Sequence, residues 1–461
     1  MKKHTSPHPE RKRKKKVPLN EEWAKIHPDA AGIDIGAREN YVCVPVGRDA
    51  ESVRCFGTTT PELEQMSQWL KRCGVKTVAM EATGIYWIAA FQILERDGFR
   101  VVLANPRQVK NVSGRKSDVQ DCQWIQKLHT FGLLSASFRP GDPYCVARSY
   151  VRLRDDLVAS RSAQIQLMQK ALHQMNVQLS QVLSDITGES GMAMIEAILK
   201  GQTDPVALAS LANRRVHSSR ERIAQALVGD YRAEHLFALQ TAYDLYLAYQ
   251  KKITQCDDRL IQELDRLPDK VDLKLKPLAP AAEKKQIDET LREGLYLKLG
   301  VDITAIEGIG ARVGLTLLTE VGPDLGAFPS EKHFCSWLGL CPENRISGGR
   351  VLHTRTRPVV NGLANALRMA ATTLERNQSA LGAFHRRMKA KLGAAEAITA
   401  TAHKLARLIY RLLKHGEEYI REGLEHYEQK NRERKLRAVR NMAQSLGLEI
   451  LEPQPAVSSV S

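Results

Sequence analysis

The sequence predicts an α/β domain with a mixed β-sheet, followed by a mostly helical remainder. In residues 29–145, short runs of alternating apolar and polar residues are separated by turns rich in Gly and Asp and by two helical segments. From residue 146 onward, apolar residues recur instead at intervals of three and four, which is the spacing of amphipathic helices. At 461 residues the chain is long enough for two or three domains.

The order of elements in residues 29–145 defines the expected sheet. Strands are predicted at residues 31–35, 41–46, 52–56, 77–81 and 100–104, and helices at 61–72 and 85–97. Three strands joined by short turns form an antiparallel meander, and strands that follow a helical crossover add parallel pairs to it. In such a sheet the first and fourth strands can be neighbours.

The next region, residues 146–267, predicts a long helical arm in the form of a hairpin, with residues 224–267 as its second helix. Its apolar stripe is compatible with a coiled-coil dimerisation arm or with ordinary helix packing within one chain. Residues 268–296 are rich in Pro, Lys and Glu and predict a linker or a loosely packed insertion. Residues 297–428 predict a second, mostly helical domain.

The charge of the chain indicates a polyanionic partner. The formal net charge is +16 and the pI is about 9.4, which favours binding to nucleic acid or to an anionic membrane surface. Residues 1–28 carry a basic run at 11–16 and predict a disordered tail that either solubilises the chain or binds phosphates. Residues 429–461 predict a basic helix with a cluster at 430–440, followed by a frayed end.

Several other classes of protein are disfavoured. No stretch approaches the roughly 20 apolar residues of a membrane-spanning helix, and the N-terminal residues lack the apolar core of a secretory signal. The eight cysteines form no C-x-x-C pair, which argues against a zinc knuckle and against a disulfide framework. We therefore expect a cytoplasmic, nucleoid-associated protein that does not bind membranes.

Two carboxylates stand in predicted strands, where an alternating apolar pattern does not favour a charge. Asp34 lies between Ile33 and Ile35 in the first strand, and Glu81 ends the fourth strand. A buried, unpaired carboxylate is costly, so each is expected either to be protonated with a raised pKa or to face a cation. If the two strands are neighbours, both carboxylates meet at one edge of the sheet.

A second pair, Asp118 and Asp121, opens the helix that follows the fifth strand. Their spacing of three residues places both on one face of that helix. One interpretation is compensation of the helix dipole behind a Ser117 cap. The other joins them to Asp34 and Glu81 in a site for Mg²⁺, or Mn²⁺, where two such ions can stabilise the attacking and leaving oxygens at a phosphodiester.

Four short motifs mark this region, and three of them carry the acids. They are Gly32-Ile-Asp-Ile-Gly, Met80-Glu-Ala-Thr-Gly-Ile-Tyr-Trp, Asn105-Pro-Arg-Gln-Val and Lys116-Ser-Asp-Val-Gln-Asp. In order and spacing they resemble the DEDD transposases of bacterial insertion sequences, the insertion-sequence one-ten family. The resemblance implies that residues 29–145 form a RuvC-like domain of the RNase H fold, with Asp34, Glu81, Asp118 and Asp121 as its catalytic, metal-binding residues.

A longer motif supports the same resemblance in the C-terminal region. It reads Trp337-Leu-Gly-Leu-Cys-Pro-Glu-Asn-Arg-Ile-Ser-Gly-Gly-Arg. It resembles the transposase domain of the family, in which a serine before glycine is the nucleophile, and Ser347 matches that position. Because a serine hydroxyl needs a base, a metal or a positive field to react, Arg345 and Arg350 are candidates to stabilise the phosphate that it attacks. Without the resemblance, a Ser-Gly-Gly surface turn would be expected.

Other residues are candidate nucleic-acid contacts. Residues 306–310 read Ile-Glu-Gly-Ile-Gly and resemble a helix-hairpin-helix turn, in which Gly308 and Gly310 would let backbone N–H groups approach a phosphate. The alternative is a glycine turn between two packed helices. The basic candidates are Arg107, Lys110, Arg115, Lys116, Arg355 and Arg357. The family has a Gly-Asn pair before the following helix, which Asn361 matches only loosely, so the role of Asn361 stays open.

Taken over the whole chain, the resemblance implies a transposase that cuts and rejoins DNA through a phosphoserine intermediate beside a DEDD Mg²⁺ site. It also implies double-stranded donor and target DNA, a structured bridge RNA as guide, and a homo-oligomer from dimer to tetramer. Two alternatives stay open. One is a RuvC-like junction endonuclease that uses metal-activated water, and the other is a non-catalytic nucleic-acid scaffold.

Overall fold

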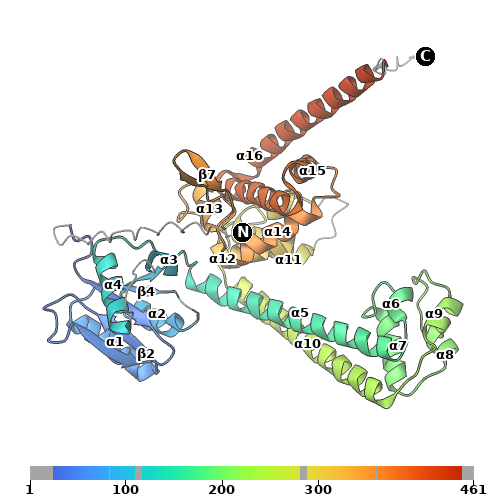
Figure 1. Ribbon diagram of the computed structural model, residues 1–461, viewed down its shortest axis with the longest axis horizontal. Helices are drawn as coiled ribbons and strands as arrows, with labels where there is room; N and C mark the ends of the chain where they lie inside the picture. The colour runs from blue at the N-terminus through green and yellow to red at the C-terminus, as the bar shows by residue number, and fades with distance from the viewer. Residues whose placement is uncertain (1–23, 83, 110–116, 281–287, 360, 449–461) are drawn as a thin grey trace, which may run out of the picture. The chain divides into compact units, whose positions relative to one another are not determined.

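The computed structural model describes residues 24–82, 84–109, 117–280, 288–359 and 361–448, which fall into two compact units (Figure 1). The N-terminal unit comprises Met1–Phe138 and holds the β-sheet. The C-terminal unit comprises Arg139–Ser461, and within its described residues it is helical apart from one small β-hairpin.

The sheet of the N-terminal unit is mixed, as predicted. Its strands are β1 (Ala30–Ile35), β2 (Glu39–Cys43), β3 (Val53–Gly57), β4 (Thr77–Glu81) and β5 (Arg100–Ala104). They lie in the order β3-β2-β1-β4-β5, in which β1 is antiparallel to β2 and parallel to β4, while β5 extends the parallel part. The predicted adjacency of the first and fourth strands is therefore confirmed.

Helices pack on both faces of this sheet. One face packs on α1 (Thr60–Arg72) and α2 (Trp87–Arg96), and its core includes Ile33 and Met80 with Trp69. The opposite face packs on α4 (Asp118–Thr130), where Ala79 and Ile125 share a smaller core. The short helix α3 (Pro106–Val109) follows β5. This arrangement gives each strand one face toward α1 and α2 and one toward α4.

Gly32 lets α4 lie directly on β1. A Cβ atom at this position would stand 2.3 Å from the backbone N of Gln126 and 2.5 Å from the carbonyl O of Cys122. Two residues earlier in β1, the carbonyl O of Ala30 accepts a 3.3 Å hydrogen bond from Gln126 Nε2. β1 and α4 therefore run in opposite directions, so the carboxyl end of β1 lies near the N-terminus of α4.

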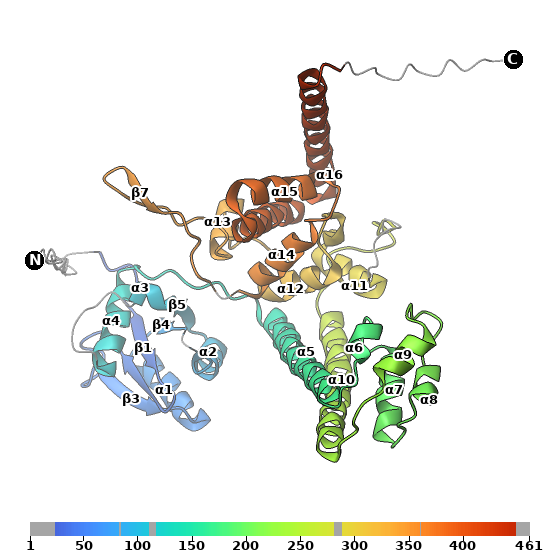
Figure 2. The ribbon, with the colours of Figure 1, turned by 45° about the vertical axis from the view of Figure 1, so that its right-hand side comes forward.

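The predicted helical hairpin is present in the C-terminal unit (Figure 2). Its two helices, α5 (Asp142–Gln174) and α10 (Ala233–Asp265), pack along each other, with an ion pair from Arg154 to Asp257 and a 3.3 Å hydrogen bond from Cys256 Sγ to the carbonyl O of Tyr150. Both helices belong to the same chain, and apolar side chains such as Leu153 and Ile261 stay about half exposed on them.

A small helical cluster closes the hairpin. It consists of α6 (Leu179–Val182), α7 (Glu189–Leu199), α8 (Pro205–Ser210) and α9 (Arg220–Ala226) around its own apolar core. The prediction of one helix over 224–267 was wrong, because the chain turns between α9 and α10. At this turn a Cβ on Gly229 would lie 2.4 Å from the carbonyl O of Met175, and Asp230 N donates to that same oxygen over 2.8 Å.

The segment 268–296 differs from the predicted linker, because its second part enters helix α11 (Glu289–Leu299). Charges within this segment and just after it are paired and buried. Arg292 is 4% exposed and bonds Asp302 at 2.6 Å, and Lys298 is 7% exposed and bonds Asp269 at 2.6 Å. Buried charges are tolerated when they are paired and hydrogen-bonded in this way.

The rest of the C-terminal unit packs around one long helix. Its elements are η1 (Ile303–Ala305), α12 (Ala311–Val321), α13 (Glu331–Trp337), β6 (Arg345–Ser347), β7 (Arg350–His353), α14 (Gly362–Thr373), α15 (Ala380–Leu392) and α16 (Ala394–Ser445). Helices α13, α14 and α15 pack against α16, which is kinked at Gly416. Among the described residues, none of the helices has the length and apolar character needed to cross a membrane.

Candidate catalytic site

Asp34 and Glu81 stand side by side on the α4 face of the sheet. Ile33 of β1 and Met80 of β4 are paired in register, and both side chains belong to the core against α1 and α2. Because side chains alternate along a strand, the next residues, Asp34 and Glu81, point to the opposite face. Adjacent strands lie about 4.8 Å apart, so the two carboxylates share one end of the sheet.

The first turn of α4 lies above this end of the sheet. Ser117 caps the helix by accepting a 3.3 Å hydrogen bond from Gln120 N, and Asp118 and Asp121 follow in the first turn. Two residues of strand span about the same length as four residues of helix. Since Cys122 lies over Gly32, the turn that carries the two aspartates lies near Asp34.

The electrostatics of Cys122 agree with this placement. Its pKa is raised, mainly by a hydrogen bond with Cys43 and by burial, and the charge of Asp34 contributes further. Cys122 directly follows Asp121, and its carbonyl O lies against Gly32, two residues before Asp34. Two strands and one helix thus bring the four predicted acids to the same region.

The four side chains do not form a closed ligand set. Asp34, Glu81 and Asp121 are half-buried and Asp118 is exposed, and no group of three or more His, Cys, Asp or Glu in the described part of the chain has the spacing to hold a metal ion. The donors are all carboxylate oxygens, the ligands that hard divalent cations prefer. The residues therefore fit such a cation by chemistry and by the face that they share.

Ser347 lies at the tip of the β6–β7 hairpin, which projects from the helices (Figure 2). Ser347 pairs with Arg350, and the two turn residues, Gly348 and Gly349, have φ values of 55° and 76°. Both positive φ values fit a type I′ turn, which strongly favours glycine. Residues 346–350 are all exposed, so the hydroxyl of Ser347 stands on a surface turn that offers its backbone to a large partner.

The base of this hairpin accounts for two of the predicted arginines. Glu343 N donates to the carbonyl O of Arg355 over 2.9 Å, while the side chain of Arg355 is exposed. Arg357 donates from Nη2 to the carbonyl O of Ser336 over 2.7 Å and so helps to hold the hairpin to α13. Arg350 is exposed beside Ser347, and Arg345 contributes its backbone to β6.

Asn361 is the N-cap of α14. Its side chain accepts a 2.9 Å hydrogen bond from Ala364 N, and the residue is 9% exposed. An Asn before an apolar helical segment is a common cap, so this role was readable from the sequence. Asn361 therefore caps the helix that follows the segment carrying Ser347.

The glycine turn at 306–310 joins η1 to α12, and its two glycines differ. Gly308 has a φ of 82°, and a Cβ there would lie 3.0 Å from the side chain of Leu374, so it is needed for packing. Gly310 is the N-cap of α12, and a Cβ there would meet nothing within 4 Å. The space beside Gly310 is therefore open, as the approach of a phosphate would require.

Four basic residues complete the set of predicted contacts. Arg107 belongs to α3, whereas Lys110, Arg115 and Lys116 lie outside the described residues.

One residue that the sequence did not single out joins three helices of the C-terminal unit. Glu320 of α12 is 7% exposed and pairs with Arg152 at 2.8 Å and Arg148 at 3.5 Å, both on α5. Its Oε1 would lie 3.0 Å from a Cβ on Gly362, the first residue of α14. Arg148 and Arg152 are four residues apart and so lie on one face of α5. This spacing in the sequence could have indicated that they share a partner.

The fold and the four acids agree with a DEDD domain, and two family models match the chain. The mixed sheet, with carboxylates at the ends of β1 and β4 and at the start of α4, is consistent with an RNase H-like DEDD domain. Residues 31–177 match a family model described as a transposase, the DEDD domain of IS110 elements, and residues 302–386 match the model described as "Transposase IS116/IS110/IS902 family". The chain belongs to the IS110 family of transposases.

A relative from Sinorhizobium fredii agrees with this assignment. The chain is 33% identical over 127 residues to a protein named "Putative transposase y4pF/y4sB". The match covers 25% of this chain and 32% of that protein, about a third of its length. Residues 178–301 and 387–461, which include the helical cluster, α10 and α16, lie outside both family matches.

Proposed function

We propose that the protein is a site-specific DNA recombinase in which Ser347 is the nucleophile and the carboxylate end of the sheet assists it. The observation that carries this proposal is the placement of Asp34 and Glu81 on adjacent parallel strands, on the face that α4 covers. Two carboxylates on adjacent strands present their oxygens on one face of the sheet. They are suited to divalent-cation chemistry at a phosphodiester.

The proposed strand transfer conserves the phosphodiester bond. Ser347 Oγ forms a bond to phosphorus while the bond from phosphorus to one DNA oxygen breaks, and the proton of the serine passes to that leaving oxygen. In the second half, a DNA hydroxyl attacks the phosphoserine and Ser347 regains its proton. One phosphate ester replaces another at each step, so no ATP is needed.

Asp34, Glu81, Asp118 and Asp121 would hold Mg²⁺, or Mn²⁺ in its place. When bound, such an ion stabilises negative charge on the phosphate oxygens. The exposed Arg350 adds positive charge beside the serine, the exposed Arg355 adds it at the base of the hairpin, and Gly348 and Gly349 leave room for a phosphate.

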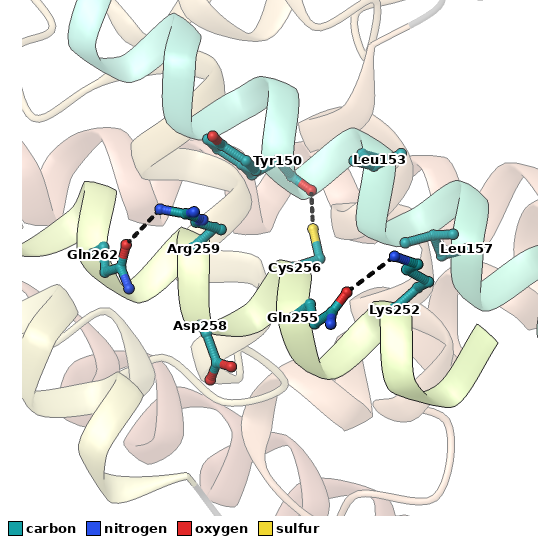
Figure 3. A pocket seen from close by; sticks show the side chains of 9 residues that line it. All are labelled: Tyr150, Leu153, Leu157, Lys252, Gln255, Cys256, Asp258, Arg259 and Gln262. Atoms are coloured by element: carbon teal, nitrogen blue, oxygen red, sulfur yellow. Dashed lines mark hydrogen bonds between the residues drawn. The ribbon is translucent and has the colours of Figure 1, made fainter. Parts of the chain in front are cut away.

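We propose that the protein acts as a homo-oligomer through a groove on the helical hairpin (Figure 3). Leu153, which is 50% exposed, and Leu157 line the groove from α5, and the charged side chains Lys252, Asp258 and Arg259 line it from α10. An apolar strip bordered by both signs of charge suits a two-fold contact with a second copy. Leu153→Asp should shift the sedimenting species toward the monomer, and an unchanged mass would exclude this contact.

We also propose that a structured RNA guides the protein to its DNA sites. The charge of +16 supports binding to more than one nucleic acid, because each phosphate that is neutralised releases counterions. Purification from cells that carry the complete element should recover an RNA transcribed beside the gene. Recombination that survives complete RNase digestion of the sample would remove the guide from the account.

Strand exchange with purified protein tests the recombinase directly. Ser347→Ala should abolish both the covalent protein–DNA adduct and recombination, whereas Asp34→Asn should abolish strand cleavage and leave duplex binding intact. The junction endonuclease predicts instead that Ser347→Ala still cleaves DNA with a metal ion and water.

A further inference from the structure

The distal part of α16 is an exposed helix that the proposed chemistry does not use. After the kink at Gly416, where φ is 84°, the helix continues to Ser445. We call its residues 430–446 the C-terminal basic helix (red in Figure 1). Its described side chains are exposed, apart from Ala443, and the segment lies beyond the family match that ends at residue 386.

Basic residues follow one side of this helix. Residues 430–440 contain six Lys or Arg and one acidic residue, Glu433. Lys430, Arg434 and Arg437 are spaced by four and three residues, so their side chains fall on one face. We call these three the basic stripe. It spans about 10 Å along the helix axis, which is comparable to a few phosphates along one nucleic-acid strand.

The other side of the C-terminal basic helix is apolar but interrupted. Leu436, Val439 and Met442 are 48%, 54% and 67% exposed and recur at intervals of three. Arg432 and Lys435 are placed by their spacing on the same side as these residues, not on the basic stripe. The charges of the segment are therefore divided between two faces that can be tested separately.

We propose that the basic stripe binds the phosphate backbone of a nucleic-acid duplex. A regular row of exposed cations on a rigid helix matches the regular charge of a duplex, and such contacts are independent of sequence. The stripe would hold the DNA outside the reaction centre and raise affinity without taking part in chemistry. The inference rests on the proposed function only in requiring that the partner be a nucleic acid.

Two other occupants fit less well. A second copy of the same helix would bring together two segments that each carry six basic residues against one acidic residue, which repel each other. A helix that lies in an anionic membrane surface needs a clean apolar face, usually with aromatic residues. Here Arg432 and Lys435 interrupt that face, and it has no aromatic residue.

The test compares two double variants of the full-length chain with equal change in charge. Arg434→Glu with Arg437→Glu removes the basic stripe, and Arg432→Glu with Lys435→Glu is the matched control with the same spacing. Binding to a random-sequence DNA duplex is measured without divalent metal between about 50 and 200 mM salt. The stripe variant should lower the slope of log K against log salt by about 2 and weaken binding at least about tenfold, and the control should change the slope by less than about 1.

Two results would overturn the proposal. Equal losses in both variants would mean that net charge alone matters, and wild-type affinity in the stripe variant would mean that the stripe contacts no phosphate.

Binding to phosphatidylserine vesicles tests the alternative that the helix contacts a membrane. If Leu436→Ser with Val439→Ser released the chain from vesicles, and the stripe variant kept full duplex affinity, the helix would be a membrane contact. Circular dichroism checks that each variant stays helical. Any of these failures leaves Asp34 and Ser347 active in strand exchange, so it is distinguishable from failure of the proposed function.

Discussion

The two regions proposed for catalysis are built in opposite ways. The carboxylate end of the sheet stands on fully buried residues, since Ile33 and Met80, which precede Asp34 and Glu81, are both 0% exposed. The hairpin of Ser347 has almost no packing, because Ile346 and Leu352 are 61% and 66% exposed. The fold itself thus positions the acids, whereas the serine requires a bound partner to fix its position. Binding should also cover the two exposed apolar side chains.

The largest effect is expected from a carboxylate change that leaves the fold intact. Glu81→Gln should lower strand cleavage by about a thousandfold, because several kcal/mol of charge stabilisation at the phosphate would be lost. Glu51→Gln is the control, since Glu51 is exposed in the loop after β2, at the other end of the sheet. Single-turnover cleavage measures both. Equal activity of the two variants would remove Glu81 from the site.

The next effect tests whether the fold positions the acids. Gly32→Ala should destabilise the N-terminal unit by roughly 3 kcal/mol, because the added Cβ would stand against the backbone of α4. Gly294→Ala in α11, where a Cβ would meet nothing within 4 Å, should leave stability unchanged or slightly raised. Hydrogen exchange of the β1 and β4 amides measures the difference. A Gly32→Ala protein with wild-type protection would contradict the close packing of α4 on β1.

Acid should weaken the N-terminal unit through His129. Burial, with the nearby charges of His27 and Arg100, lowers the pKa of His129 to about 4, and its Nε2 lies 2.9 Å from Thr77 Oγ1. The contribution of His129 to the stability of the folded chain is fully present above pH 6.5, where the side chain is neutral in both the folded and the unfolded state. Between pH 6.5 and 4 only the unfolded chain gains the proton, so stability falls with pH by about 3 kcal/mol.

Urea unfolding across this pH range measures the effect. The slope between pH 6.5 and 4 should become smaller in His129→Gln, which cannot take up the proton. An unchanged slope in that variant would assign the acid sensitivity to other histidines.

The smallest effect on stability is expected in the hairpin. Gly348 has a positive φ, so Gly348→Val should strain the turn by about 1–2 kcal/mol and lower strand transfer roughly tenfold, while the midpoint of thermal unfolding stays the same. Asn tolerates this conformation better, so Gly348→Asn should retain most of the activity. Thermal unfolding and strand transfer are measured on both variants. A large fall in the midpoint would show that the hairpin belongs to the core after all.

Much of the N-terminal unit was predictable because its pattern is local. Alternating residues identified the strands, and Asp34 and Glu81 drew attention as charges in apolar strands. The short turns and helical crossovers gave the mixed sheet and allowed β1 to neighbour β4. What the pattern could not give was the course of α4 over β1, which depends on the absence of a side chain at Gly32 and on contacts far apart in sequence.

The C-terminal unit was less predictable because long-range pairing decides its structure. The composition of residues 268–296 suggested a linker, whereas Arg292 and Asp269 of this segment are paired with Asp302 and Lys298, which lie beyond it. The break before α10 follows from Gly229 meeting the backbone of Met175, which no local pattern contains. The family motif left the role of Asn361 open, although an Asn directly before a helix indicates an N-cap, which is the role that it has.

The most direct test of the proposed chemistry is to identify the residue that becomes covalently bound to DNA. A DNA substrate that traps the cleaved intermediate is incubated with the protein, the adduct is digested with trypsin and nuclease, and the modified peptide is sequenced by mass spectrometry. The account predicts a nucleotide phosphate on Ser347, and no adduct in Ser347→Ala or Asp34→Asn. An adduct on another residue, or full strand exchange by Ser347→Ala, would contradict it.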